Sequence, residues 1–413
     1  MANLREDAAR IIDASLRAVL PDEAVARALQ SFTPPAGRLV LVAVGKAAWQ
    51  MAKAAVGHLG GAVSAGIVIT KYGHAGGALP PLLIREAGHP VPDQNSFDAT
   101  DEAIRLVQPL GADDAVLLLL SGGGSALFEK PLCQPASLAD LTDRLLRCGA
   151  DIVEMNTLRK RVSAVKGGRF AQLCAPARVF SIVLSDIVGD PLDMIASGPA
   201  YPDQSTAEQA YAVVEKYGLQ LPPDVLPLLG QALPRRLDHV ETKVTGSVRE
   251  LCAAAAAACR ALGYQPTVLT ASLCCEAREA GSFLASIAQY HADPPKPLAF
   301  IAGGETVVHI TGTGMGGRNQ EIALSAARGI AGLAGAAVFS VGSDGTDGPT
   351  DAAGGLVDGS TCARLAAQGI SIDRALADND AYHALAQADG LVRTGPTGTN
   401  VNDVSVLLLR PQD

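Results

Sequence analysis

The stretch Ala115-Val116-Leu117-Leu118-Leu119-Leu120-Ser121-Gly122-Gly123-Gly124-Ser125 decides the fold of this chain. An apolar run of this length that stops at Ser and three glycines is typical of a buried parallel strand. Because glycine has no Cβ, residues 121–125 can expose successive backbone N–H groups, and the helix expected next adds its positive N-terminus. The loop is therefore predicted to hold an anion, with a plain strand-to-helix turn as the alternative.

The composition favours a compact enzyme of two domains. A chain of 413 residues exceeds what one ordinary core accommodates. With 48% hydrophobic residues, 43 glycines and 18% charged residues, it resembles an α/β enzyme rather than a disordered or repeat protein. A net charge of -9 argues against nucleic-acid and acidic-membrane partners.

Processing and redox signals indicate a cytoplasmic protein. The chain begins with acids where a signal peptide has its apolar segment, and no window approaches the length of a membrane span. Eight cysteines lack C-x-x-C spacing, and Cys252 and Cys259 lie on one face of an alanine-rich helix, so we expect reduced core cysteines. A homodimer is compatible with the sequence, which does not determine the number of subunits.

Apolar runs predict the order of the strands. In the first part of the chain we expect strands at 39–44, 65–70, 82–87, 115–120 and 179–184. Four prolines within 218–240 place a domain boundary there, giving domains 1–238 and 239–413. Beyond it, strands are expected at 242–245, 267–270, 298–302, 306–310, 337–341 and 404–409, the first of them opening the second domain.

Lys46 and His89 each follow a predicted strand. Open α/β sheets bind ligands at the carboxyl ends of their strands, so Lys46 is a candidate cation for phosphate or carboxylate. The surrounding residues are not a Walker loop, and an ordinary surface lysine is the alternative. His89 lies in the rigid loop Gly88–Asp93, where it could orient a substrate or, slightly favoured, satisfy a turn carbonyl.

Two acids follow the predicted strand 179–184. Asp186 and Asp190 are four residues apart and are candidate ligands of Mg²⁺, which takes one or two carboxylates and completes its shell with water and phosphate oxygens. The alternative for Asp190 is that it caps a helix beginning at Pro191.

A basic cluster lies between residues 159 and 169. Its five cations are Arg159, Lys160, Arg161, Lys166 and Arg169. Such a run in an acidic protein is usually a solvated face, but this one, which includes Gly167-Gly168, could also surround polyphosphate.

The last third carries several polar loops. Glu305 ends a predicted strand, and residues 312–317 formally match G-x-G-x-x-G just before Arg318 and Asn319. That match is weak, because the acid of the dinucleotide fingerprint is missing at the expected distance. Asp344 and Asp347 stand in another glycine-rich loop, and Asn400 lies in a loop before the closing strand.

Taken together, six ordered motifs resemble the class II glycerate 2-kinase family. They are Gly122–Ser125, Ser185-Asp186 with Gly189-Asp190, Gly303–Glu305, Gly316–Glu321, Asp344–Gly348 and Thr397–Asn400. The resemblance implies a larger Rossmann-like, doubly wound amino-terminal domain and a smaller α/β carboxyl-terminal MOFRL domain. It also implies transfer of the γ-phosphoryl group of ATP to the C2 hydroxyl of D-glycerate, with the substrate between the domains. Lys46 and Arg318 match its cationic active-site positions, whereas Arg161 stands where the family is expected to have His.

These observations combine into one hypothesis about the site. Ser121 to Ser125 cradle phosphate, Lys46 and Arg318 neutralise phosphate or the glycerate carboxylate, and Asp186 or Asp190 holds Mg²⁺ or accepts the hydroxyl proton. The further binding candidates are Lys166, Glu305, Asn319, Asp344, Asp347 and Asn400. Alternative functions are an NAD(P)H-dependent hydroxypyruvate reductase and a non-enzymatic sensor of sugar acids or nucleotides.

Overall fold

The computed structural model describes residues 4–411 and contains two compact units. The parallel-sheet unit comprises Val25–Leu184 and Asp190–Thr245. The mixed-sheet unit comprises Met1–Ala24, Ser185–Gly189 and Gly246–Asp413. The mixed-sheet unit is therefore built from three segments of the chain: the amino-terminal end, the short stretch 185–189 and the residues from Gly246 onward.

The parallel-sheet unit contains a sheet of order β3-β2-β1-β4-β5-β6 in which all neighbours run parallel. The strands are β1 (Leu39–Val44), β2 (Val63–Lys71), β3 (Leu82–Ala87), β4 (Ala115–Leu120), β5 (Arg178–Val183) and β6 (Val240–Val244). Every residue of the central strands β1 and β4 is buried, as their unbroken apolar sequences require. This strand order is that of a doubly wound dinucleotide-binding fold, so the expected fold class is confirmed.

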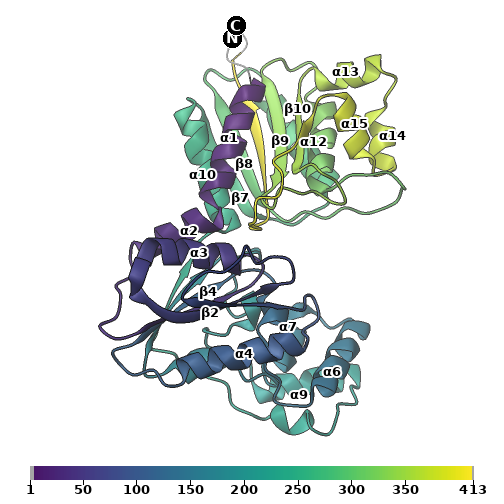
Figure 1. Ribbon diagram of the computed structural model, residues 1–413. Helices are drawn as coiled ribbons and strands as arrows, with labels where there is room; N and C mark the ends of the chain where they lie inside the picture. Colours follow the sequence, from purple (N-terminus) through teal and green to yellow (C-terminus); the bar gives the residue numbers. More distant parts are fainter. Residues whose placement is uncertain (1–3, 412–413) are drawn as a thin grey trace. The chain divides into compact units, whose positions relative to one another are not determined.

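Helices cover this sheet. They are α3 (Ala48–Leu59), α4 (Gln94–Val107), α5 (Gly124–Leu127) and α8 (Arg169–Cys174). Three further helices, α6 (Pro135–Arg147), α7 (Ile152–Arg159) and α9 (Ala207–Tyr217), pack mainly against one another and against α4. Figure 1 shows α3 and α4 on opposite sides of the strands. Right-handed crossovers that run in opposite directions along a sheet produce this arrangement. The helix α2 (Pro21–Leu29) precedes β1.

The strand near residue 242 belongs to a different sheet from the one expected. We predicted that it opens the second domain, but β6 pairs in parallel with β5 and completes the first sheet. The proline-rich segment before it is a connection within this unit, since it joins β5 to its neighbour. Proline spacing marks a break in regular structure, but it does not say which sheet the next strand joins.

The mixed-sheet unit contains a sheet of order β11-β10-β9-β12-β8-β7. Its strands are β7 (Gln265–Leu273), β8 (Leu298–Gly304), β9 (Ala336–Gly342), β10 (Gly354–Asp358), β11 (Leu391–Val392) and β12 (Asp403–Leu409). β7 and β8 are parallel, and the other pairs are antiparallel. The wholly buried β12 lies between β9 and β8, so its first residue, Asp403, pairs with Gly342 and Gly304.

The prediction of a strand at 306–310 is wrong. The segment is irregular apart from one bridge between Val307 and Glu276, and Val307 and Ile310 are exposed. Both edges of β8 are already paired, with β7 and β12, so the residues after β8 have no free edge to join.

Helices also surround the mixed sheet. They are α1 (Leu4–Ala18), α10 (Val248–Ala261), α11 (Ala277–Tyr290), α12 (Arg318–Gly329), α13 (Thr361–Ala367), α14 (Ile372–Ala377) and α15 (Ala381–Gln387). Cys252 and Cys259 are buried on α10, as is Cys174 on α8, whereas Cys274 is exposed and the other four are half-buried. All eight lie within the described residues and are free thiols there. Helix α12 is buried along most of its length and supports β9 and β10.

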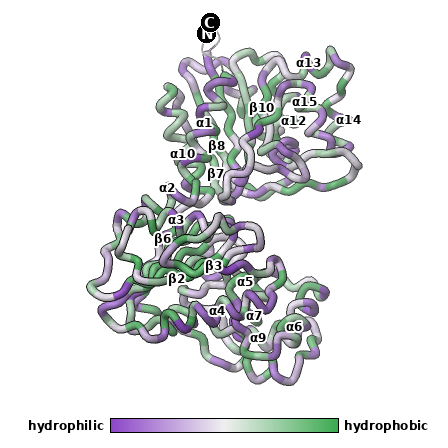
Figure 2. Tube along the Cα trace, viewed as in Figure 1, coloured by the Kyte–Doolittle hydropathy of each residue, from purple (hydrophilic) through white to green (hydrophobic). Residues whose placement is uncertain are grey.

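Hydropathy follows this architecture. Figure 2 shows hydrophobic segments along the strands around β2, with hydrophilic segments in the loops and outer helices. Within residues 4–411, none of the helices has the length and apolar character that crossing a membrane requires.

Candidate active site

The loops after β1 and β4 are locked together at the carboxyl edge of the parallel sheet. The N–H of Lys46 donates to the carbonyl of Gly122 at 2.9 Å, and the N–H of Ala47 donates to Ser121 Oγ at 3.1 Å. Gly45 has φ +124°, and a Cβ there would lie 2.5 Å from the Ser121 carbonyl oxygen. Close packing of two loops therefore explains why glycine precedes Lys46.

The glycine loop leaves consecutive backbone donors available. Within residues 4–411, the N–H groups of Gly122, Gly123, Gly124 and Ser125 donate to no protein acceptor. Gly123 has φ +87°, and the one-turn helix α5 begins at the next residue. Buried or half-buried N–H groups normally have partners, so this run needs water or a bound anion.

Lys46 stands beside this loop with a free ammonium group. Its side chain is exposed and makes no ion pair or hydrogen bond within the described part of the chain. A Cβ placed on Gly123 would lie 3.3 Å from Lys46 Cγ. The structure therefore brings together the predicted cation and the predicted anion loop.

The basic cluster is not a solvated face. Lys160, Arg161 and Lys166 are each at most 3% exposed. Arg161 donates to the carbonyls of Leu229 and Gln231, at 3.1 and 2.7 Å, and so ties a loop to α7. The interpretation of the basic cluster as a solvated face is wrong, because these side chains are buried and donate their hydrogen bonds to acceptors inside the protein.

The side chain of Lys166 is buried and bonds to the backbone next to the glycine loop. Its Nζ donates to the carbonyls of Ser125 and Phe128, at 2.8 and 3.0 Å, and lies 3.3 Å from Glu129 Oε2. Burial lowers the pKa of Lys166 to about 8, against the attraction of Glu129. Because Lys166 is fully buried and bonds to the backbone beside the glycine loop, we expect it to support that loop, and direct binding stays a prediction.

Asp186 and Asp190 fall into different compact units. Residues Ser185–Gly189 group with the mixed-sheet unit, whereas Asp190 belongs to the parallel-sheet unit. Asp190 has φ +54°, and its Oδ1 is buried without a hydrogen-bond partner. No α-helix begins at Pro191, so capping does not account for Asp190.

A buried polar cluster occupies one edge of the mixed sheet. Arg318, the first residue of α12, donates from Nε and Nη2 to the two carboxylate oxygens of Asp403, at 2.5 and 3.1 Å. Its Nη1 donates to Glu305 at 2.9 Å. Burial raises the pKa of Asp403, while the bonds from Arg318 oppose that shift. Arg318 is therefore fixed in direction by two acids.

Asp347 holds the start of α12. Its oxygens accept the backbone N–H groups of Asn319 and Gln320, at 3.1 and 2.8 Å. Burial raises the pKa of Asp347 to about 7, even though these N–H bonds favour the charged form. The Asn319 amide oxygen accepts from Ser340 at 2.6 Å, which anchors the same turn to β9.

Two further predicted residues lie in loops near this edge. Asp344 accepts the N–H of Thr346 at 2.9 Å, and the exposed Asn400 accepts the N–H of Asn402 at 3.2 Å. The G-x-G-x-x-G match lacks the geometry of a dinucleotide loop. It follows an irregular segment, and Gly312 and Gly314 pack against Asp378 and Asp380.

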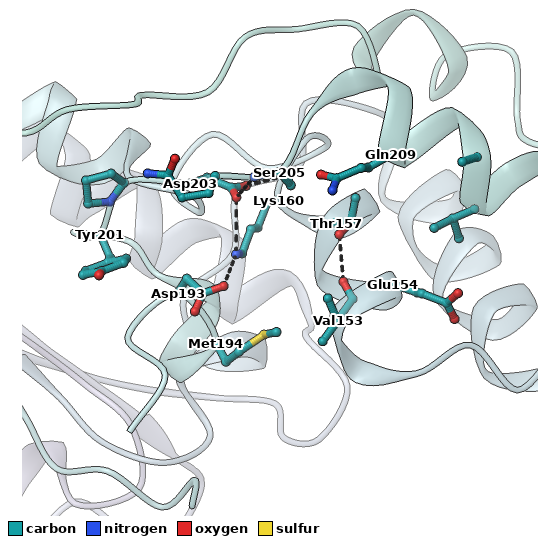
Figure 3. A pocket seen from close by; sticks show the side chains of 14 residues that line it. Val153, Glu154, Thr157, Lys160, Asp193, Met194, Tyr201, Asp203, Ser205 and Gln209 are labelled. Carbon is teal, nitrogen blue, oxygen red and sulfur yellow. Dashed lines mark hydrogen bonds and ion pairs between the residues drawn. The ribbon is translucent and has the colours of Figure 1, made fainter. Parts of the chain in front are cut away.

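A cavity of about 610 Å³ lies beside α7 in the parallel-sheet unit. Figure 3 shows Lys160 reaching between Asp193 and Asp203, at 3.3 and 3.8 Å. Asn156, on the same helix, accepts from Ser197 at 3.0 Å, and Ser197 shares a 3.1 Å hydrogen bond with Ser125. The wall of the cavity is thereby connected to the glycine loop.

Sequence reasoning missed the roles of Asp403 and Glu129. Asp403 is the first residue of β12 and the only charged one in an otherwise mostly apolar strand, so its position at the end of a polar loop was a signal that could have singled it out. Glu129 is fully buried, and no local pattern distinguishes it from a surface acid.

The fold and these two polar edges define a class of two-unit α/β enzymes. A family model described as a domain of unknown function, DUF4147, matches residues 7–230, and the MOFRL family model matches residues 298–403. The D-glycerate 2-kinase of Thermotoga maritima is 50% identical, over 98% of this chain and 99% of that protein.

Two other comparisons extend this result. The crystal structure of a glycerate kinase from Thermotoga maritima gives a TM-score of 0.94 at 50% identity, covering 98% of this chain and 99% of that one. A putative hydroxypyruvate reductase of Agrobacterium vitis is 40% identical, over 90% of this chain and 100% of that protein. The chain belongs to the class II glycerate 2-kinase family.

Proposed function

We propose that the chain is an ATP-dependent D-glycerate 2-kinase, which transfers a phosphoryl group to the C2 hydroxyl of glycerate. Phosphoryl transfer requires positioned cations and backbone donors more than covalent chemistry from the protein. The observation that carries the proposal is the run of four N–H groups that, among the described residues, have no protein acceptor and lie beside the Lys46 side chain, which has no ion pair there. The identity to a D-glycerate 2-kinase names the acceptor substrate.

The proposed roles are assigned to the residues of each unit by itself. The backbone N–H groups of Gly122 to Ser125 bind phosphate, while the N–H of Ser121 donates to the Val44 carbonyl at 2.9 Å and holds the loop against β1. Lys46 neutralises the charge that builds up on the transferred group. Arg318 faces the glycerate carboxylate or a phosphate, held in direction by Asp403 and Glu305. In this proposal Asn319, Asp344, Asp347 and Asn400 shape the binding surface around Arg318. Lys166 acts by holding the glycine loop in place.

Mg²⁺ fits the acids that follow β5. Asp190 offers a buried carboxylate oxygen without a partner, which is the kind of donor that the ion takes. Among residues 4–411, no three His, Cys, Asp or Glu side chains form a metal site by themselves. That agrees with an ion held by one or two carboxylates and completed by phosphate oxygens and water. We propose Asp190 as a ligand of this ion, and Asp186, which belongs to the other unit, as a separate candidate. The ion would offset charge on the nucleotide phosphates.

Hydroxypyruvate reduction is the alternative, because a relative carries that name. A reductase of this kind needs a glycine turn that leads from a strand directly into a helix, with an acid for the ribose. Residues 305–317 between β8 and α12 are irregular, and Gly312 and Gly314 face other backbone segments. The kinase is therefore the better supported function. A cytoplasmic location and a homodimer remain predictions.

Two parallel assays test the proposal. The purified full chain is incubated with D-glycerate, ATP and Mg²⁺ while ADP is measured, and separately with hydroxypyruvate and NADH while absorbance at the nicotinamide band is followed. We expect ADP release and a phosphorus NMR signal coupled to the C2 proton. NADH oxidation without ADP release would establish the reductase instead, and phosphate on C3 would overturn the regiochemistry.

A further inference from the structure

The loop after β3 carries His89 across the sheet to the glycine loop. In the strand order β3-β2-β1-β4, two strands separate β3 from β4. Neighbouring strands are about 4.8 Å apart, so the loop spans roughly 14 Å. A Cβ placed on Gly123 would lie 3.0 Å from His89 Cδ2 and 3.2 Å from His89 Nε2. The imidazole therefore rests directly on the predicted phosphate loop.

The His89 imidazole has no hydrogen-bond partner in the part of the chain that the structure describes. Within residues 4–411, neither ring nitrogen of His89 makes a hydrogen bond, although the side chain is half-buried. The turn-carbonyl role that its sequence position favoured is not observed. Other residues hold the loop, because Asp93 caps α4 and its Oδ2 accepts from Tyr72 at 2.6 Å. His89 is thus free to act on a ligand.

The electrostatic surroundings keep this imidazole neutral. Burial lowers the pKa of His89, and Lys46, Lys71 and His74 lower it further. These groups come from the ends of β1 and β2 and from the following loop, and the glycine loop itself contributes no titratable side chain. A neutral imidazole presents one donor and one acceptor nitrogen. The positive surroundings favour an anionic ligand and a developing alkoxide.

We propose that His89 is a catalytic residue of the glycerate kinase reaction and accepts the proton of the C2 hydroxyl. This inference rests on the proposed function. The O–H bond of glycerate breaks as its proton passes to the free imidazole nitrogen. The C2 oxygen forms the new bond to the γ-phosphorus, the bond from that phosphorus to the β,γ-bridging oxygen breaks, and ADP leaves with the electron pair. The nearby Lys46 ammonium stabilises the charge on the phosphoryl oxygens.

The test compares His89→Ala, His89→Asn and His89→Gln with wild type in the full chain, using ADP release with D-glycerate. Proton transfer by a positioned side chain contributes about 10²–10⁴-fold, so we expect kcat to fall by at least about 100-fold in all three variants. KM for glycerate should change little. His58→Ala, which removes an exposed imidazole from the end of α3, is the matched control and should behave as wild type.

Two readouts distinguish proton transfer from a structural role. The wild-type kcat should decline as the pH falls through the pKa of His89, which lies below the ordinary histidine value, and this decline should be absent in His89→Ala. Added imidazole should restore part of the turnover of His89→Ala, with thermal melting confirming that the variant is folded. His89→Gln covers the case in which the Ala variant does not fold.

The possible outcomes separate this inference from the proposed function. If wild type releases no ADP with glycerate, the proposed function is overturned, and this inference with it. If wild type is active and His89→Ala or His89→Gln turns over at a similar rate, this inference alone is overturned. Restoration of turnover by His89→Asn, which can hydrogen-bond but cannot take up the proton, would also overturn it.

Discussion

Arg318 and Asp403, 85 residues apart in the sequence, form a two-point ion pair at the edge of the mixed sheet. Asp403→Asn keeps the shape of the side chain and removes its charge. Breaking a buried pair costs about 3–5 kcal/mol, and because Arg318 is 30% exposed we expect a loss of about 2 kcal/mol in unfolding free energy. Turnover should fall as well, since Arg318 loses its fixed direction.

Chemical denaturation and ADP release measure these two effects. Asp351→Asn is the matched control, because Asp351 pairs with Arg393 at an exposed position and should change stability by less than about 1 kcal/mol. Equal shifts in the two variants would contradict the assigned role of Asp403. Arg318→Ala is a poorer test, because it leaves the Asp403 carboxylate buried without its cation.

Lys46→Ala should abolish most turnover while leaving the fold intact. The side chain is exposed and has no partner within the described residues, so its removal costs little stability. Loss of one positioned charge-stabilising group typically lowers kcat by about 10²–10³-fold. Lys53→Ala, on the adjacent helix α3, should retain wild-type turnover. Near-normal kcat in Lys46→Ala would remove Lys46 from the mechanism.

Gly123→Ala should lower stability by more than the strain of its positive φ angle predicts, and it should also lower turnover. Placing Ala at a left-handed position costs about 1–2 kcal/mol, and here the new methyl also meets His89 and Lys46. Gly149→Ala is the matched control, because Gly149 has φ +73° with nothing within 4 Å of its Cβ position. Denaturation should show a loss of about 1–2 kcal/mol in Gly149→Ala and a larger loss in Gly123→Ala. In kinetic assays, loss of turnover should be confined to Gly123→Ala. Full turnover in Gly123→Ala would contradict a ligand site at this loop.

The buried pair of Lys166 and Glu129 should show strong coupling. Lys166→Met leaves an uncompensated buried carboxylate and is expected to cost about 3–5 kcal/mol of stability. Adding Glu129→Met should recover part of that loss, because both charges are then gone. Turnover should stay low in the double variant, since the Ser125 and Phe128 carbonyls lose their donor. Additive stability changes in the double-mutant cycle would show that the pair is not coupled.

Asp347 should make stability depend on pH. Its folded-state pKa, about 7, lies above the ordinary value for an aspartate. Between about pH 4 and pH 7 the folded protein therefore binds more protons than the unfolded chain, and stability falls as the pH rises. Asp347→Asn should flatten this slope in denaturation curves measured across that range. An unchanged slope would mean that the burial of Asp347 does not control its titration.

Part of this fold could be predicted from local patterns. The unbroken apolar residues of β1 and β4 require burial on both faces, so their strands followed directly from the sequence. The glycines at the end of β4 also indicated a loop of free N–H groups. The segment 306–310 shows the limit of such patterns, because its residues suit a strand but both edges of β8 are occupied.

The candidate site was predictable only as a set of separate loops. Lys46 and the glycine loop both follow strands of one parallel sheet, and parallel strands end at a common edge, so their meeting was foreseeable. The position of His89 beside the glycine loop was not foreseeable, because two strands separate β3 from β4 and the loop after β3 has no periodic signal.

The sequence by itself determined which segments are strands or helices and which loops can expose backbone donors, because those properties depend on neighbours a few residues away. Only the tertiary structure decided that the basic cluster around Lys166 is buried, that Asp403 fixes Arg318 and that β6 joins the first sheet. Those outcomes depend on contacts between residues far apart in the chain. The free energy of burying a charge is set by such contacts, and residue order alone does not contain them.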